Sequence, residues 1–132
     1  MSYSQFVRLV LDHLLYFSCE LEKARTFHVD VLGCSVENEE AWGFIFLRLP
    51  EGGHIGLMHP RNWGGWREGD PLPEPVLCLR TDDLQEAIAE LGRRGARLSE
   101  PDGEAGQARG CRLTDPAGRT IYIFEDPSEP LP

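Results

Sequence analysis

Residues 11–33 read LDHLLYFSCELEKARTFHVDVLG, and this stretch decides the fold. It opens within an apolar run over residues 6–17 that is rich in β-branched and aromatic side chains, which predicts a strand. Leu21, Ala24 and Phe27 then recur at helical spacing. Gly33 follows them as a stop signal. We therefore expect a strand and then an amphipathic helix of about three turns.

A hairpin is expected next. Residues 42–49 (WGFIFLRL) and 54–59 (HIGLMH) have the composition of strands, and the Pro-Glu-Gly-Gly sequence between them favours a tight turn. Residues 60–75 contain several Gly and Pro residues, so we expect an irregular linker there. That linker carries Trp63 and Trp66.

The order of strand and helix repeats after the linker. Residues 76–80 predict a strand, Asp82-Asp83 a helix start, and residues 111–114 and 121–125 two further strands. Leu21 and Leu84, like Ala24 and Ala87, are 63 positions apart, which indicates an internal duplication. The predicted fold is a single α+β domain of two βαβββ modules, with curved mixed sheets around a central cavity. Module one covers about 6–60, the linker 60–75, module two 76–125 and a tail 126–132.

Charge and cysteine content narrow the function. The formal net charge of −9 disfavours nucleic acid and anionic membranes as partners, and no apolar run is long enough to cross a bilayer. Four cysteines without a CxxC pair, and no apolar signal peptide, predict a cytoplasmic protein. No nucleophile motif or phosphate-binding loop is present, so we assign no catalytic residue.

Three segments carry a family resemblance. The first is residues 11–33, with His13 in the strand and Leu32-Gly33 as the stop; the others are TDDLQEAIAELGRRG (81–95) and LTDPAGRTIYIFE (113–125). Together they resemble the glyoxalase/bleomycin-resistance/dioxygenase superfamily, also called the vicinal oxygen chelate superfamily. His28 and Arg119 depart from the usual Tyr and Asn, which does not alter the expected fold.

The resemblance also implies where a metal would bind. Metal-dependent members hold one divalent ion with four side chains, and the corresponding positions here are His13, Gly56, Val76 and Tyr122. Gly and Val cannot ligate through a side chain, and a neutral Tyr is a poor ligand. We therefore expect no cofactor, with His13 as a weak metal candidate and His54 as its only plausible partner on the same face.

Strand parity predicts the cavity wall, because alternate residues share a face with the former ligand positions. The predicted ligand-binding residues on the strands are His13, Leu15, Phe17, His54, Met58, Cys78, Tyr122 and Phe124. Trp63 and Trp66 are added either as a lid over the cavity or as indoles that cover the core edge or a subunit interface.

This wall is nearly uncharged and aromatic, which favours binding of a small molecule over catalysis. We expect a metal-free protein that sequesters an aromatic or cationic ligand, such as an antibiotic, and that forms a homodimer. The alternative is a metal-dependent lyase, isomerase or dioxygenase of the same superfamily. A regulatory or scaffold module is a third possibility.

Overall fold

The structure is a computed structural model that describes residues 7–103 and 108–132. The chain forms two compact units: unit 1 comprises Met1–Asp12 and Leu77–Pro132, and unit 2 comprises His13–Val76. The predicted first strand began at Phe6, which lies outside the described residues; residues 7–9 are described but irregular, so the strand itself begins at Val10. No helix within the described ranges has both the length and the apolar character required to cross a membrane.

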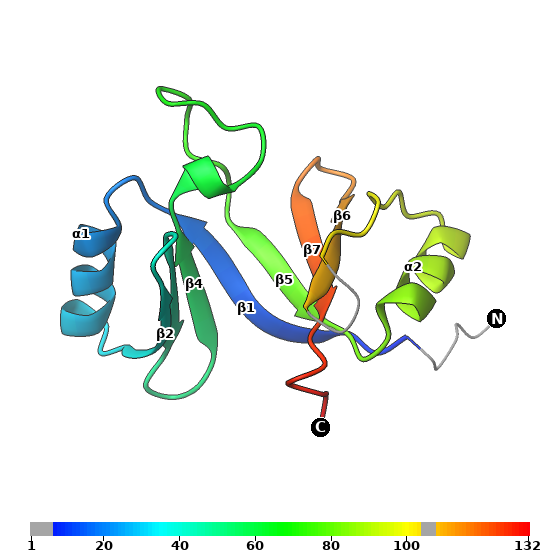
Figure 1. The fold of residues 1–132 in the computed structure, drawn as a ribbon, viewed down its shortest axis with the longest axis horizontal. Coiled ribbons are helices and arrows are strands. Elements are labelled where there is room, and N and C mark those ends of the chain that lie inside the picture. The colour runs from blue at the N-terminus through cyan, green and yellow to red at the C-terminus, as the bar shows by residue number, and fades with distance from the viewer. Residues whose placement is uncertain (1–6, 104–107) are drawn as a thin grey trace. The chain divides into compact units, whose positions relative to one another are not determined.

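Unit 2 is built on a mixed sheet with the strand order β2-β3-β4-β1 (Figure 1). β1 (Val10–Phe17) pairs in parallel with β4 (His54–Met58), whereas β3 (Phe44–Arg48) pairs antiparallel with both β4 and β2 (Ser35–Glu40). The predicted hairpin is β3–β4. The predicted linker begins with the short 3-10 helix η2 (Pro60–Asn62) and continues without further helix or strand up to β5.

The first helix differs from the predicted three regular turns. α1 (Leu21–Thr26) passes directly into the π-helix η1 (Phe27–Val31), where Leu32 N–H donates to Phe27 O over 3.3 Å. His28 places its Nδ1 2.7 Å from Ala24 O, the carbonyl that a regular helix would pair with the His28 backbone. The imidazole therefore competes for that acceptor and favours the wider turn.

β2 was absent from the sequence prediction because SVENEE shows no alternation of apolar residues. In the structure it is the edge strand of unit 2, and its backbone pairs with β3 around a bulge between Val36 and Asn38. Val36 is its only apolar side chain, and it packs against the core beneath α1. Acidic side chains elsewhere on the strand suit an exposed edge that must not pair further.

Unit 1 contains a three-stranded mixed arrangement in the order β5-β7-β6. β5 (Val76–Arg80, of which Val76 is grouped with unit 2) pairs in parallel with β7 (Thr120–Glu125), and β6 (Arg109–Thr114) pairs antiparallel with β7. α2 (Leu84–Arg93) starts where predicted, because the Asp83 carboxylate accepts the Glu86 N–H at 3.0 Å. Between α2 and β6, where a complete βαβββ module would have one more strand, the described residues form only the isolated bridges Leu98–Leu113 and Asp102–Gly110.

Each sheet has one face covered by its helix. Beneath α1, Ile45, Leu47 and Leu57 form a buried cluster. Leu84 of α2 forms a second buried cluster with Cys111 of β6 and Ile123 of β7. Strand parity predicts that six apolar residues pack under the helices: Ile55, Leu57, Leu77, Leu79, Ile121 and Ile123. All of them except Leu77 belong to or pack against these clusters. The opposite face of each sheet is therefore available for function.

Candidate ligand-binding faces

The free face of unit 2 carries a row of four rings, Trp42, Phe44, Phe46 and His54, which we call the aromatic row. Successive ring centroids lie 5.7, 6.2 and 4.9 Å apart, and neighbouring planes are inclined by only 13°, 26° and 10°. Trp42 is 52% exposed and the other three rings are half-buried. Ordered, partly exposed rings of this kind offer a rigid surface for stacking a planar molecule.

His13 lies edge-on against this row. Its ring centroid is 5.2 Å from that of Phe46, with an interplanar angle of 88°, and 6.3 Å from that of Phe44. Gly56 makes the arrangement possible, because a Cβ atom there would lie 2.9 Å from Phe44 and 3.0 Å from His13. The three side chains are thus packed together, and the position of Gly56 has no room for a larger residue.

Acidic side chains border the aromatic row along β2. Asn38 and Glu40 pair in register with Phe46 and Phe44, and the Asn38 amide donates to the Glu40 carboxylate at 3.1 Å. Glu37, in the bulge, lies with its Oε1 3.3 Å from His54 Nε2. This edge of the ring surface is therefore negatively charged.

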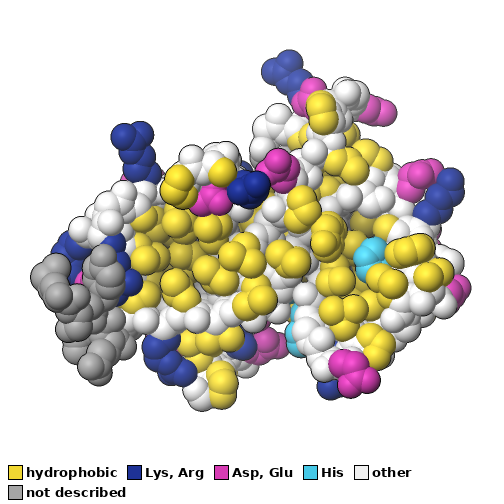
Figure 2. Space-filling view, turned by 180° about the vertical axis from the view of Figure 1, so that it is seen from behind, with side chains coloured by type: hydrophobic (Ala, Val, Ile, Leu, Met, Phe, Trp, Pro, Cys, Tyr) yellow, Lys and Arg dark blue, Asp and Glu magenta, His cyan; other side chains and the backbone are white. Residues whose placement is uncertain are grey.

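Of the other predicted wall residues in unit 2, Leu15 and Phe17 are buried and Met58 is half-buried. Leu15 pairs with Gly56 and Phe17 with Met58, as parity required. Trp63 from the linker packs on Phe17, with ring centroids 5.4 Å apart. Figure 2 shows hydrophobic side chains gathered in broad patches, with most charged side chains toward the margins.

Trp66 has different ring neighbours from Trp63. It helps to line a groove of about 600 Å³ whose walls are Cys19, His59, Arg61, Trp66, Glu68, Gly69 and Asp70. Its indole N–H donates to Pro71 O at 3.1 Å, and its ring meets His59 edge-on with centroids 5.9 Å apart. The linker thus holds the Trp66 indole through its own hydrogen bond, whereas the Trp63 indole packs on β1.

The free face of unit 1 centres on Tyr122 and Phe124, whose rings are stacked with centroids 6.0 Å apart. Tyr122 lies across Gly110: a Cβ atom at Gly110 would come within 2.2 Å of the phenol oxygen. Cys78 pairs with Tyr122 in the parallel ladder and is buried. Burial, reinforced by the nearby Asp12 charge, raises the pKa of the Cys78 thiol to about 12. That thiol is protonated at neutral pH and is a poor nucleophile.

Tyr122 has a specific polar partner. Its hydroxyl donates to Asp102 Oδ1 over 3.3 Å. Burial, followed by the charge and the hydrogen bond of Asp102, raises the pKa of Tyr122 well above its usual range. The phenol is therefore neutral and oriented.

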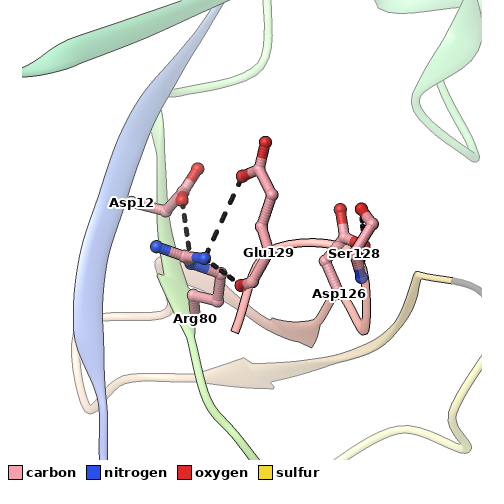
Figure 3. Close-up of polar contacts among 5 residues, drawn as sticks. All are labelled: Asp12, Arg80, Asp126, Ser128 and Glu129. Atoms are coloured by element: carbon pink, nitrogen blue, oxygen red, sulfur yellow. Dashed lines mark hydrogen bonds and ion pairs between the residues drawn. The ribbon is translucent and has the colours of Figure 1, made fainter. Parts of the chain in front are cut away.

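Arg80 lies beside this face in an ion-pair cluster of unit 1 (Figure 3). Its Nε is 3.3 Å from Asp12 Oδ1, and its Nη1 donates to the carbonyl oxygen of Glu129 in the tail. The contact with Asp12 is an ion pair rather than a hydrogen bond, because the buried Nε has no hydrogen-bond partner among the described residues. With 16% and 15% of their side chains exposed, Arg80 and Asp12 neutralise one another in a mostly buried setting.

The side chains at the four implied metal positions do not fit a divalent ion. Phe44 and His13 fill the space at Gly56, Val76 is apolar, and the Tyr122 phenol is held neutral by its surroundings. Within the described ranges, no group of three or more His, Cys, Asp and Glu is placed to hold a metal. A single imidazole, that of His13, is too small a ligand set to hold a divalent ion against water.

Sequence reasoning missed four residues of these faces: Trp42, Phe44, Phe46 and Asp102. A signal for the first three was present, since Trp42, Phe44 and Phe46 alternate in WGFIF and alternate strand residues share a face. Their side of the sheet becomes known only from the pairing of Phe46 with Gly56. No local signal marks Asp102, because its partner Tyr122 lies 20 residues away.

The glyoxalase/bleomycin resistance protein/dioxygenase superfamily model matches residues 10–128. The chain belongs to this superfamily. The resemblance seen in the sequence is thereby confirmed, and so is the predicted α+β fold with curved mixed sheets. A search of curated protein sequences gives no match.

Solved structures of the superfamily fold include methylmalonyl-CoA epimerase from Mycobacterium tuberculosis, with a TM-score of 0.72, 24% identity, and coverage of 100% of this chain and 94% of that one. A variant of homoprotocatechuate 2,3-dioxygenase from Brevibacterium fuscum matches with a TM-score of 0.59 and 24% identity. The enzyme from Arthrobacter globiformis matches with a TM-score of 0.61 and 23% identity. Those two alignments include 88% of this chain but only 32% and 35% of the dioxygenases. Identities this low show a common fold and no more.

Proposed function

We propose that the protein binds a small planar, largely apolar molecule without holding a metal, and that the aromatic row of unit 2 is its main contact surface. The observation that carries this proposal is the row of four rings, whose neighbouring planes are nearly parallel and which His13 contacts edge-on. Phe44 and His13 pack against each other over Gly56, so a ligand would not need to order these two side chains.

We favour sequestration over catalysis because the Cys78 and Tyr122 side chains, which could react, are in their unreactive protonated forms. The Cys78 thiol is protonated at neutral pH, and the Tyr122 phenol is neutral. Release of a bound molecule unchanged is the expected outcome, and an antibiotic is one ligand class that fits a flat apolar surface.

A metal-dependent lyase, isomerase or dioxygenase is the second candidate. The comparisons favour it more than sequestration, because the similar structures are an epimerase and dioxygenases. An enzyme of this type would need metal ligands beyond the four implied positions, whose side chains do not fit. The two candidates therefore differ in a quantity that can be measured directly, the metal content.

The decisive experiment combines metal analysis with ligand titration. Protein purified without an affinity-tag metal is expected to contain far less than one divalent ion per chain. Titration with 3-ethylindole, a neutral planar probe, is expected to show binding by calorimetry. Phe46→Ala should weaken that binding about tenfold or more. Phe27→Ala is the matched control, because it removes a phenyl ring that lies on η1 and is 51% exposed, and it should not change the binding.

Stoichiometric metal that survives dialysis would favour the enzyme and overturn the metal-free proposal. Equal effects of the two Phe substitutions would show that the aromatic row is not the contact surface. Failure of 3-ethylindole to bind at millimolar concentration would count against a planar apolar ligand.

A further inference from the structure

We propose that Tyr122 and Asp102 form a polar subsite in unit 1 that recognises a protonated amine, or another N–H donor, on the ligand. This inference rests on the proposed ligand-binding function and concerns a small aromatic molecule bound by unit 1 alone, with Phe124 as its ring contact.

The first step is the rigidity of the pair. Asp102 and Gly110 exchange two backbone hydrogen bonds, of 2.8 Å from Asp102 N–H and 3.1 Å from Gly110 N–H. Tyr122 lies over the same Gly110, in space that any Cβ atom would occupy. Asp102 is thus anchored by its backbone at the point over which the Tyr122 ring lies, so phenol and carboxylate are brought together without ligand.

The second step is the direction of the hydrogen bond. A phenol has one proton, and Tyr122 donates it to Asp102. The phenol oxygen is then left with acceptor lone pairs only. Burial and the Asp102 charge keep the proton on Tyr122, since both raise its pKa. A ligand that approaches this oxygen must therefore supply a donor, such as N–H, and not a carboxylate.

The third step is charge. Asp12 is a second carboxylate near this face, where its charge raises the pKa of the Cys78 thiol, and it is neutralised by Arg80. No ion pair within the described part of the chain uses Asp102. Among the described residues, the negative charge at Asp102 is therefore not neutralised by a cation. It also polarises the phenol, which strengthens the hydroxyl oxygen as an acceptor.

The fourth step is the ring beside the subsite. Phe124 is stacked on Tyr122, so an apolar ring surface adjoins the acceptor oxygen. An aromatic amine would place its ring against this surface and its ammonium group toward Tyr122 Oη and Asp102. The same geometry rejects an aromatic acid, because its carboxylate would meet a second carboxylate without a donor between them.

The experiment compares three probes that share an indole ring: tryptamine, 3-ethylindole and indole-3-propionate, titrated into the full-length protein by calorimetry at pH 7. Tryptamine is expected to bind about tenfold more tightly than 3-ethylindole, and indole-3-propionate most weakly. Tyr122→Phe and Asp102→Asn should each reduce the preference for tryptamine to about twofold or less and leave 3-ethylindole binding nearly unchanged.

Glu100→Gln is the matched control, because it removes one exposed negative charge from unit 1 without touching Tyr122. It should preserve the preference for tryptamine. Equal loss of preference in Glu100→Gln would show attraction by net charge alone and overturn the subsite. If 3-ethylindole binds but tryptamine shows no preference in the wild type, the subsite is refuted while the proposed function stands. If no probe binds, the proposed function itself fails.

Discussion

Gly110→Ala tests whether the position of Tyr122 is built into the fold. The added Cβ atom would lie 2.2 Å from the Tyr122 hydroxyl oxygen and 2.3 Å from Cζ, so the ring must leave its place. Forcing extra volume into a packed position costs about 1–3 kcal/mol. Removal of a glycine from the unfolded chain offsets about 0.4–1 kcal/mol of that. A net destabilisation of about 1–2 kcal/mol is expected, together with loss of the preference for tryptamine.

The assay is urea unfolding followed by circular dichroism, with Gly92→Ala as the matched control. Gly92 lies in α2, and a Cβ atom added there would meet nothing within 4 Å, so alanine should stabilise the protein by about 1 kcal/mol. A double-mutant cycle completes the test: in a Tyr122→Ala background, Gly110→Ala should no longer destabilise.

Two results would refute this reasoning. The first is Gly110→Ala with a free energy of unfolding at or above that of the wild type. The second is a destabilisation that persists unchanged in the Tyr122→Ala background, because the clash with the ring would then not be its cause.

Three further predictions concern buried charge and thiols. Arg80→Ala should destabilise the protein by about 2–3 kcal/mol, since it leaves the mostly buried Asp12 carboxylate without its ion pair to Arg80; Asp12→Asn combined with Arg80→Ala should recover part of the loss in urea unfolding. The pKa of Cys78 is higher in the folded protein, about 12 against 9.0, so its contribution to stability is complete below pH 9 and is lost as the pH rises from about 9 to 12. Cys78→Ala should flatten the decline of unfolding free energy in that range, and an equally steep decline would contradict the assignment. An aromatic disulfide reagent at pH 8 should label one thiol per chain, Cys19, because it alone of the four cysteines is exposed; rapid labelling of two or more would contradict the buried positions.

The sequence alone was sufficient to predict those elements whose formation depends on residues close to one another in the chain. Residues 10–17 form a strand because a run rich in branched and aromatic apolar side chains favours one. α2 begins at Leu84 because Asp83 caps it, and an Asp before a helical apolar stripe is visible without coordinates. The 63-residue offset and the motifs around His13 and Asp115 were enough to name the superfamily, which the match to residues 10–128 then confirmed.

Tertiary structure was needed wherever a residue's role depends on another strand. β2 has no apolar pattern of its own, and it is a strand because β3 offers its backbone donors and acceptors. The π-turn at Phe27–Val31 occurs together with a contact of the His28 ring with Ala24 O, which residue spacing does not reveal.

For the candidate site, too, the sequence predicted some features and others required the tertiary structure. Parity along each strand grouped Leu15 with Phe17 and Tyr122 with Phe124, because the period of a strand is two residues whatever its neighbours are. The aromatic row required the register that sets Phe46 opposite Gly56, and the polar subsite required the bridge that sets Asp102 opposite Gly110. Register between strands is fixed by hydrogen bonds between distant segments and by the side-chain volumes that fit between them. Those are properties of the folded chain, and the local sequence does not contain them.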